Sequence, residues 1–288
     1  MMKFMHRLQT FLLIVAILGA IYVVFLMPTG DGTGPVDQGG NGAGATTTQK
    51  DFNLYTYLNE AKSARGKLVF DATFNFDNQD KLTIKSEQSF ETRGPETSCK
   101  GSTIYNMNGD AGVLDDIAYI QNGVKYTKAA TGFVQSNYNT LNAGNMNISK
   151  IADALERQDG TVKEDGITCY KMTGTITYAD MSNDFRTLIR EQGINVANIK
   201  DLPMNVTIFI TETNLPYKVV FEFTDAQCMV KASALKSKNC TATGKLVVSF
   251  SGFNGIEKID FPGEIFNAAS GSYTITDKIS RYLGKIAY

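Results

Sequence analysis

The strongest constraint on the fold is an alternation of apolar and polar side chains that begins near residue 67. From residue 67 to residue 77 every second side chain is apolar, and those between are polar or charged except Val69. Side chains of a β-strand project alternately to its two faces, so a period of two predicts a strand with one buried face. Such strands are typical of an antiparallel sheet with one solvated face.

The same alternation recurs further along the chain. Residues 77–80 form a predicted hairpin turn, and Asn122-Gly123 is a strong hairpin signal because both residue types tolerate a positive φ. Further strands are predicted at residues 81–93, on both sides of Asn122-Gly123 within 116–128, and at 167–178, 204–212, 217–225 and 245–253.

Four other segments have apolar residues at helical spacing. They are residues 52–64, 148–155, 185–189 and 276–287, the last with Ile279, Leu283 and Ile286 on one side. Strands and helices together predict an α+β fold. We expect a mostly antiparallel curved sheet, or half-barrel, covered by a few short helices, behind an N-terminal transmembrane helix.

That transmembrane helix is predicted at residues 10–27, whose uninterrupted apolar run is just below the roughly 20 residues that a bilayer span needs. Basic residues precede the run and the next cation after it is Lys50, which places residues 1–9 in the cytoplasm. A cleaved signal peptide is the alternative, but no small-residue cleavage site follows Met27 closely. We expect a single-pass protein of the cell membrane.

Residues 28–50 are rich in Gly and Thr and have almost no apolar side chains, a composition typical of a flexible linker. Such a linker reaches on the order of 25 Å. No second linker and no fixed repeat follows. Residues 51–288 are therefore expected to form one extracytoplasmic domain.

Several kinds of site are excluded. The only histidine is His6, so the outer domain has none for a Ser/His/Asp triad, a Cys/His pair or an imidazole-bound zinc. The net charge of -1 gives no field that attracts nucleic acid. We interpret Asp115 and Asp116 as solvated turn residues, because catalytic carboxylates of glycosidases face each other across a cleft. No enzymatic activity, cofactor, metal or nucleic-acid partner is expected.

Four cysteines lie in the outer domain, where disulfides persist. Cys228 and Cys240 flank a polar stretch that has the character of a hairpin end, so we pair them and assign Cys99 to Cys169. Four free thiols are the alternative.

The order of segments also carries a family resemblance. A helix and two long strands precede the hairpin at residues 119–126, and helices and the segments at 165–174, 207–218, 247–254 and 259–262 follow. This order resembles the lipoprotein-localisation superfamily (LolA/LppX/LprG-like half-barrels) of bacterial envelopes over roughly residues 51–264. The resemblance implies an open β-barrel that holds acyl chains or glycolipids, with helices as a plug. Unlike the lipoprotein members, this chain has an uncleaved anchor, no lipidated cysteine and four internal cysteines.

Apolar side chains of the strands are the candidate walls of a ligand cavity, because each contributes about 1.5–3 kcal/mol only when it is covered. We expect a membrane-anchored protein that binds a lipid or another hydrophobic ligand in this cavity. The alternative is a cell-surface interaction or sensor module that binds another protein and no small molecule. The candidate wall residues are Phe70, Phe74, Ile84, Ile208, Phe221 and Phe250.

Overall fold

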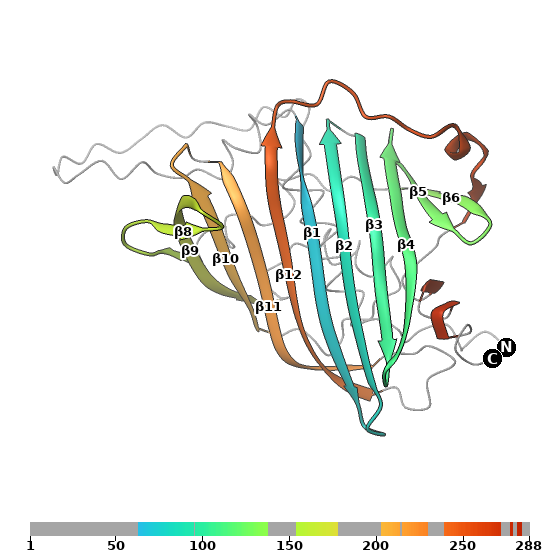
Figure 1. Ribbon diagram of the computed structural model, residues 1–288, viewed down its shortest axis with the longest axis horizontal. Coiled ribbons are helices and arrows are strands. Elements are labelled where there is room, and N and C mark those ends of the chain that lie inside the picture. Colours follow the sequence, from blue (N-terminus) through green and yellow to red (C-terminus); the bar gives the residue numbers. More distant parts are fainter. Residues whose placement is uncertain are drawn as a thin grey trace.

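The computed structural model describes residues 63–94, 96–137, 154–177, 203–213, 215–229, 239–271, 277–278 and 281–283. One large curved sheet of thirteen strands contains most of them (Figure 1). Within this part of the chain, 74% of the residues lie in strands and 6% in helices. The predicted α+β fold class is therefore wrong, because the described residues are almost entirely β.

Strands β1 to β6 follow one another along the chain with short connections, whereas residues 254–268 form a long connection between the last two strands. Their bounds are β1 (Ser63–Phe76), β2 (Lys81–Arg93), β3 (Glu96–Met107), β4 (Asp110–Gln121), β5 (Val124–Ala129), β6 (Gly132–Asn137), β7 (Leu155–Arg157), β8 (Val162–Glu164), β9 (Ile167–Thr177), β10 (Pro203–Thr211), β11 (Pro216–Met229), β12 (Asn239–Phe253) and β13 (Ala269–Ser270). A 3-10 helix, η3 (Gly263–Asn267), precedes the last strand.

Strand order in the sheet is β13-β6-β5-β4-β3-β2-β1-β12-β11-β10-β9-β7, and β8 also pairs with β9. All of these pairings are antiparallel except that of β13 with β6. Strand β1 lies in the middle of the sheet between β2 and β12, the latter from much later in the sequence (Figure 1). On one side of β1 the sheet extends outward in chain order through β2–β6, and on the other side the later strands run from the edge at β7 back to β12 beside β1.

Most strands arise where the sequence predicts them, and the turns have the predicted chemistry. Asn122 and Gly123 have φ values of 50° and 75°, as a tight hairpin between β4 and β5 requires. Asn108 and Gly109 join β3 to β4 in the same way, with φ values of 53° and 102°. Strands β3, β6, β7, β8 and β13 were not predicted.

Most of the predicted helices lie outside the described residues. Residues 52–62, 148–153 and 185–189 lie outside the described residues. Ser63 and Ala64 lie in strand β1 and Leu155 lies in strand β7, so the helix prediction is wrong at these three positions. Residues 277–278 and 281–283 are helical, within the predicted segment 276–287. Residues 10–27 and the linker 28–50 are likewise outside this part of the chain. Of the helices that the structure describes, none has the length and apolar character to cross a bilayer.

The two faces of the sheet differ in character. We call the face to which Phe70 projects the inner face, and the opposite one the outer face. Along the middle strands the outer face carries exposed ion pairs between neighbouring strands, and each contributes about 0–1 kcal/mol to stability. They include Lys85 with Asp71 at 3.3 Å and Lys245 with Glu222 at 2.7 Å. The inner face is buried.

Candidate ligand-binding face

Strand register places all six predicted wall residues on the inner face. Phe70 on β1 is opposite Leu246 on β12, which is opposite Phe221 on β11. The same alternation brings in Phe74, Ile84, Ile208 and Phe250. All six side chains are buried, with exposed fractions between 0% and 5%. Their role as walls of a cavity stays a prediction.

Close packing fills this part of the inner face. The rings of Phe90 and Phe250 meet edge to face with their centroids 6.0 Å apart. The ring of Phe223 lies over Gly244, where a Cβ atom would come within 2.3 Å of it. The glycine therefore makes room for an aromatic ring from the neighbouring strand. We call the inner-face residues of β1 and β9–β12 the apolar half.

The inner face of β2–β5 has a different composition, and we call it the polar half. Polar side chains occupy positions that share the parity of Leu82 and Ile84, so they project to the same buried side. The polar half consists of Ser86, Gln88 and Thr92 on β2, Thr97, Cys99 and Thr103 on β3, Asp116 on β4, and Lys125 and Thr127 on β5.

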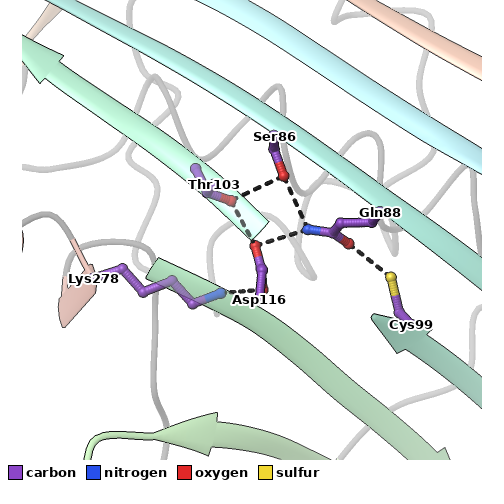
Figure 2. A network of polar contacts seen from close by, with 6 residues as sticks. All are labelled: Ser86, Gln88, Cys99, Thr103, Asp116 and Lys278. Atoms are coloured by element: carbon purple, nitrogen blue, oxygen red, sulfur yellow. Dashed lines mark hydrogen bonds and ion pairs between the residues drawn. The ribbon is translucent and has the colours of Figure 1, made fainter. Parts of the chain in front are cut away.

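A hydrogen-bond network joins three of these strands (Figure 2). Asp116 Oδ2 accepts hydrogen bonds from Gln88 Nε2 at 2.7 Å and from the Thr103 hydroxyl at 3.1 Å. The Cys99 thiol donates to Gln88 Oε1 at 2.7 Å, and Ser86 Oγ lies 2.9 Å from Thr103 Oγ1. The network fixes the Asp116 carboxylate on the inner face.

Two residues of the C-terminal segment, Lys278 and Tyr282, contact the inner face beside this network. Lys278 forms an ion pair with Asp116 and only 7% of its side chain is exposed (Figure 2). Four residues further along, the Tyr282 ring stacks on Tyr105 with the centroids 5.4 Å apart. The Tyr282 hydroxyl accepts a hydrogen bond from the Met107 N–H at 2.9 Å. Together Lys278 and Tyr282 hold this segment against the polar half.

Burial and neighbouring charges shift the pKa values of Cys99 and Lys125 in the polar half. Burial raises the pKa of the Cys99 thiol to about 12, and the Asp116 carboxylate adds to this. Burial lowers the pKa of Lys125, and so does the like charge of Lys278, while Asp116 opposes the shift. Within the described residues, Lys125 makes no ion pair and no side-chain hydrogen bond.

The raised pKa predicts that Cys99 resists alkylation, since the thiolate is the reactive form. At pH 8 iodoacetamide should leave Cys99 unmodified in the folded protein and modify it fully in urea, as measured by peptide mass spectrometry. Because the folded-state pKa lies above that of the unfolded chain, the thiol's stabilising contribution is complete below about pH 9 and is lost toward pH 12. Equal labelling rates with and without urea would contradict the prediction.

The predicted Cys99–Cys169 disulfide is wrong, because both cysteines are free. Five strands, β2, β1, β12, β11 and β10, lie between β3 and β9, so the two residues are roughly 28 Å apart across the sheet. Cys99 also projects to the inner face, whereas Cys169 packs with Phe209 and Val220 on the outer face. A disulfide needs Cα atoms within about 7 Å.

Cys228 and Cys240 are direct register partners on β11 and β12, so the predicted hairpin end is confirmed. Directly opposite residues in an antiparallel pair have Cα atoms about 4.5–5.5 Å apart, which suits a disulfide. The bridge itself stays a prediction.

The intact mass of the non-reduced chain should be about 2 Da lower than that of the reduced chain, and Cys228→Ser should abolish the difference. Maleimide labelling of both cysteines without reductant would argue against it.

The polar half was not predicted from the sequence, and the interpretation of Asp116 as a solvated turn residue is wrong. Asp116 lies within β4 and its side chain is 16% exposed. A signal was present on β2, where Ser86 and Gln88 interrupt the apolar positions between Ile84 and Phe90.

No protein-family model matches the chain, and no curated protein matches it. Among solved structures, it is similar to the lipoprotein LppX of Mycobacterium tuberculosis, with 16% identity and a TM-score of 0.39 over 70% of this chain and 91% of LppX. LprF of Mycobacterium bovis matches at 14% identity and a TM-score of 0.37, over 69% of this chain and 89% of LprF. A LolA superfamily protein of Nitrosomonas europaea matches at 8% identity and a TM-score of 0.22, over 72% and 90%. LppX and the LolA superfamily are also the groups that the order of segments in the sequence resembles.

Proposed function

We propose that this chain is a membrane-anchored extracytoplasmic protein that binds a lipid or another hydrophobic ligand along the inner face of its sheet. The observation that carries the proposal is the register, which aligns apolar side chains of β1, β2, β10, β11 and β12 on one face. An apolar ligand gains roughly 25 cal/mol for each Å² of apolar surface that it removes from water. A continuous apolar face suits an acyl chain for this reason.

Binding is favoured over catalysis by the state of the reactive groups on that face. The Asp116 carboxylate forms an ion pair with Lys278 and accepts two further hydrogen bonds, so both of its oxygens already have polar partners. The Cys99 thiol, with its pKa raised to about 12, stays protonated and is a poor nucleophile. These two groups therefore support a structural role for the network.

Photo-crosslinking tests the ligand proposal. The full-length chain in lipid nanodiscs would be exposed to a fatty acid with a diazirine on its chain, and the adducts would be located by tandem mass spectrometry. We expect adducts on Phe70 and Phe221, on the inner face, and not on their strand neighbours Val69 and Val220. Excess unlabelled fatty acid should remove them. Adducts confined to residues 10–27 or to the outer face would contradict the proposal and favour a protein-interaction module.

The anchor is a separate part of the proposal. Residues 10–27 would span the membrane, with residues 28–50 leading to the sheet outside the cytoplasm. A Thr46→Cys variant should react in intact cells with a maleimide that does not cross the membrane. Reaction only after the cells are permeabilised would place the sheet on the other side.

A further inference from the structure

One row of the polar half contains two groups without polar partners in the described part of the chain. Thr97 on β3 is directly opposite Ile120 on β4, which is directly opposite Lys125 on β5. All three therefore project to the inner face. Thr97 and Lys125 are two strand spacings apart, or about 10 Å between backbones.

The first of these groups is the hydroxyl of Thr97. The residue is 2% exposed, and its Oγ1 atom has no hydrogen-bond partner among the described residues. Buried hydroxyl groups are almost always hydrogen-bonded, because an unpaired one loses its water without compensation. The position of Thr97 thus marks a place where a further acceptor would bind favourably.

The second group is the ammonium of Lys125. The carboxylate near it, Asp116, is already paired with Lys278, and the Cys99 thiol stays neutral. One negative and two positive charges leave this cluster with a net charge of +1. The lowered pKa of Lys125 has the same origin, since burial and Lys278 both disfavour its charge. A single bound anion would balance the charge, whereas a metal ion would add to it.

The polar half directly adjoins the apolar half. Ser86 and Gln88 on β2 are opposite Phe70 and Leu68 on β1, so polar and apolar side chains meet along one strand boundary on the same face. A molecule lying across this boundary meets apolar surface at one end and hydrogen-bond donors with a net positive charge at the other. That distribution matches an amphiphile with an acidic headgroup.

We infer that the row of Thr97 and Lys125 binds the oxyanion headgroup of an amphiphile, a carboxylate or a phosphate, whose apolar chain lies along the apolar half. This inference rests on the proposed function and adds the chemical class of the ligand. Lys125 supplies the charge and the Thr97 hydroxyl donates a hydrogen bond to a headgroup oxygen.

A comparison of charged and neutral ligands tests the inference. The full-length chain in nanodiscs would be cross-linked with a diazirine fatty acid or with its methyl ester, which has the same chain and no charge. Inner-face adducts would be measured against ligand concentration. Lys125→Met removes the ammonium. Lys100→Met is the matched control, because Lys100 lies on β3 and is exposed on the outer face.

We expect the wild type and Lys100→Met to prefer the acid over the ester by about tenfold or more, the usual strength of a charge-assisted hydrogen bond. In Lys125→Met the preference should fall to near one while ester binding is unchanged. Thr97→Val should reduce acid binding severalfold without lowering stability, since the hydroxyl has no partner to lose.

The contrary results separate the two proposals. Equal binding of acid and ester by the wild type, or a preference retained in Lys125→Met, would overturn the headgroup site and leave the hydrophobic ligand in place. If neither the acid nor the ester forms adducts on the inner face, both the headgroup site and the hydrophobic ligand site are overturned. Displacement of the acid by an equal concentration of inorganic phosphate would assign the site to a free anion and overturn the amphiphile.

Discussion

Replacement of Asp116 by Asn should lower the free energy of unfolding by about 3–5 kcal/mol, the usual cost of leaving a buried charge without its partner. The Lys278 side chain is 7% exposed and loses its only anion among the described residues. Urea unfolding followed by far-ultraviolet circular dichroism measures the change. Asp115→Asn is the matched control, because this neighbour is exposed on the outer face and should change stability by less than about 0.5 kcal/mol.

A double-mutant cycle identifies the cause of the loss. Lys278→Met in the Asp116→Asn background removes the stranded charge, so it should recover most of the stability. If the destabilisation is the same with and without Lys278, the ion pair is not its origin. If Asp116→Asn behaves like Asp115→Asn, the C-terminal segment does not depend on this contact.

Replacement of Phe74 by Ala should cost about 3–5 kcal/mol, as for other fully buried aromatic side chains. Phe74 has an exposed fraction of 0% and lies between Leu82 on β2 and Ala242 on β12. Thr73→Ala, the next position on the outer face, should cost far less. Urea unfolding of both variants gives the comparison.

The size of this loss also bears on the ligand. A ring that borders bound ligand loses fewer protein contacts when it is truncated, so a cost below about 1 kcal/mol would place Phe74 at the edge of open volume instead of in a filled core. A cost in the expected range assigns Phe74 to the permanent core and removes it from the six candidate wall residues. The ligand would then contact other parts of the inner face.

The sequence predicts this sheet wherever one face of a strand is consistently apolar. Strand β2 begins and ends at the predicted residues, and the Asn122-Gly123 hairpin forms as expected. Strand β3 was missed because Thr97, Gly101 and Thr103 occupy its buried parity, so its hydrophobic period is weak. Its position is set by pairing with β2 and β4, which local sequence patterns do not encode.

The candidate site was only half predictable for the same reason. Apolar residues such as Phe70 and Phe221 are recognisable from the parity of their own strands. The polar half depends on which strands become neighbours and on Lys278, which lies 162 residues beyond Asp116 in the sequence. Periodicity within one strand cannot predict such a contact. The error on Cys99 and Cys169 has the same origin, since pairing by elimination ignored the sheet order.

The central position of β1 determines when in synthesis the sheet can form. One edge of β1 pairs with β2, which follows it at once, but the other edge pairs only with β12, where Phe76 meets Cys240. Most of the chain is therefore synthesised before the middle of the sheet can close. Until then β1 is an exposed edge strand with a row of unsatisfied backbone groups and a phenylalanine-rich face. Pairing over so long a loop is slow, so β1 stays open to pairing with other chains until β12 has been synthesised and has closed the sheet.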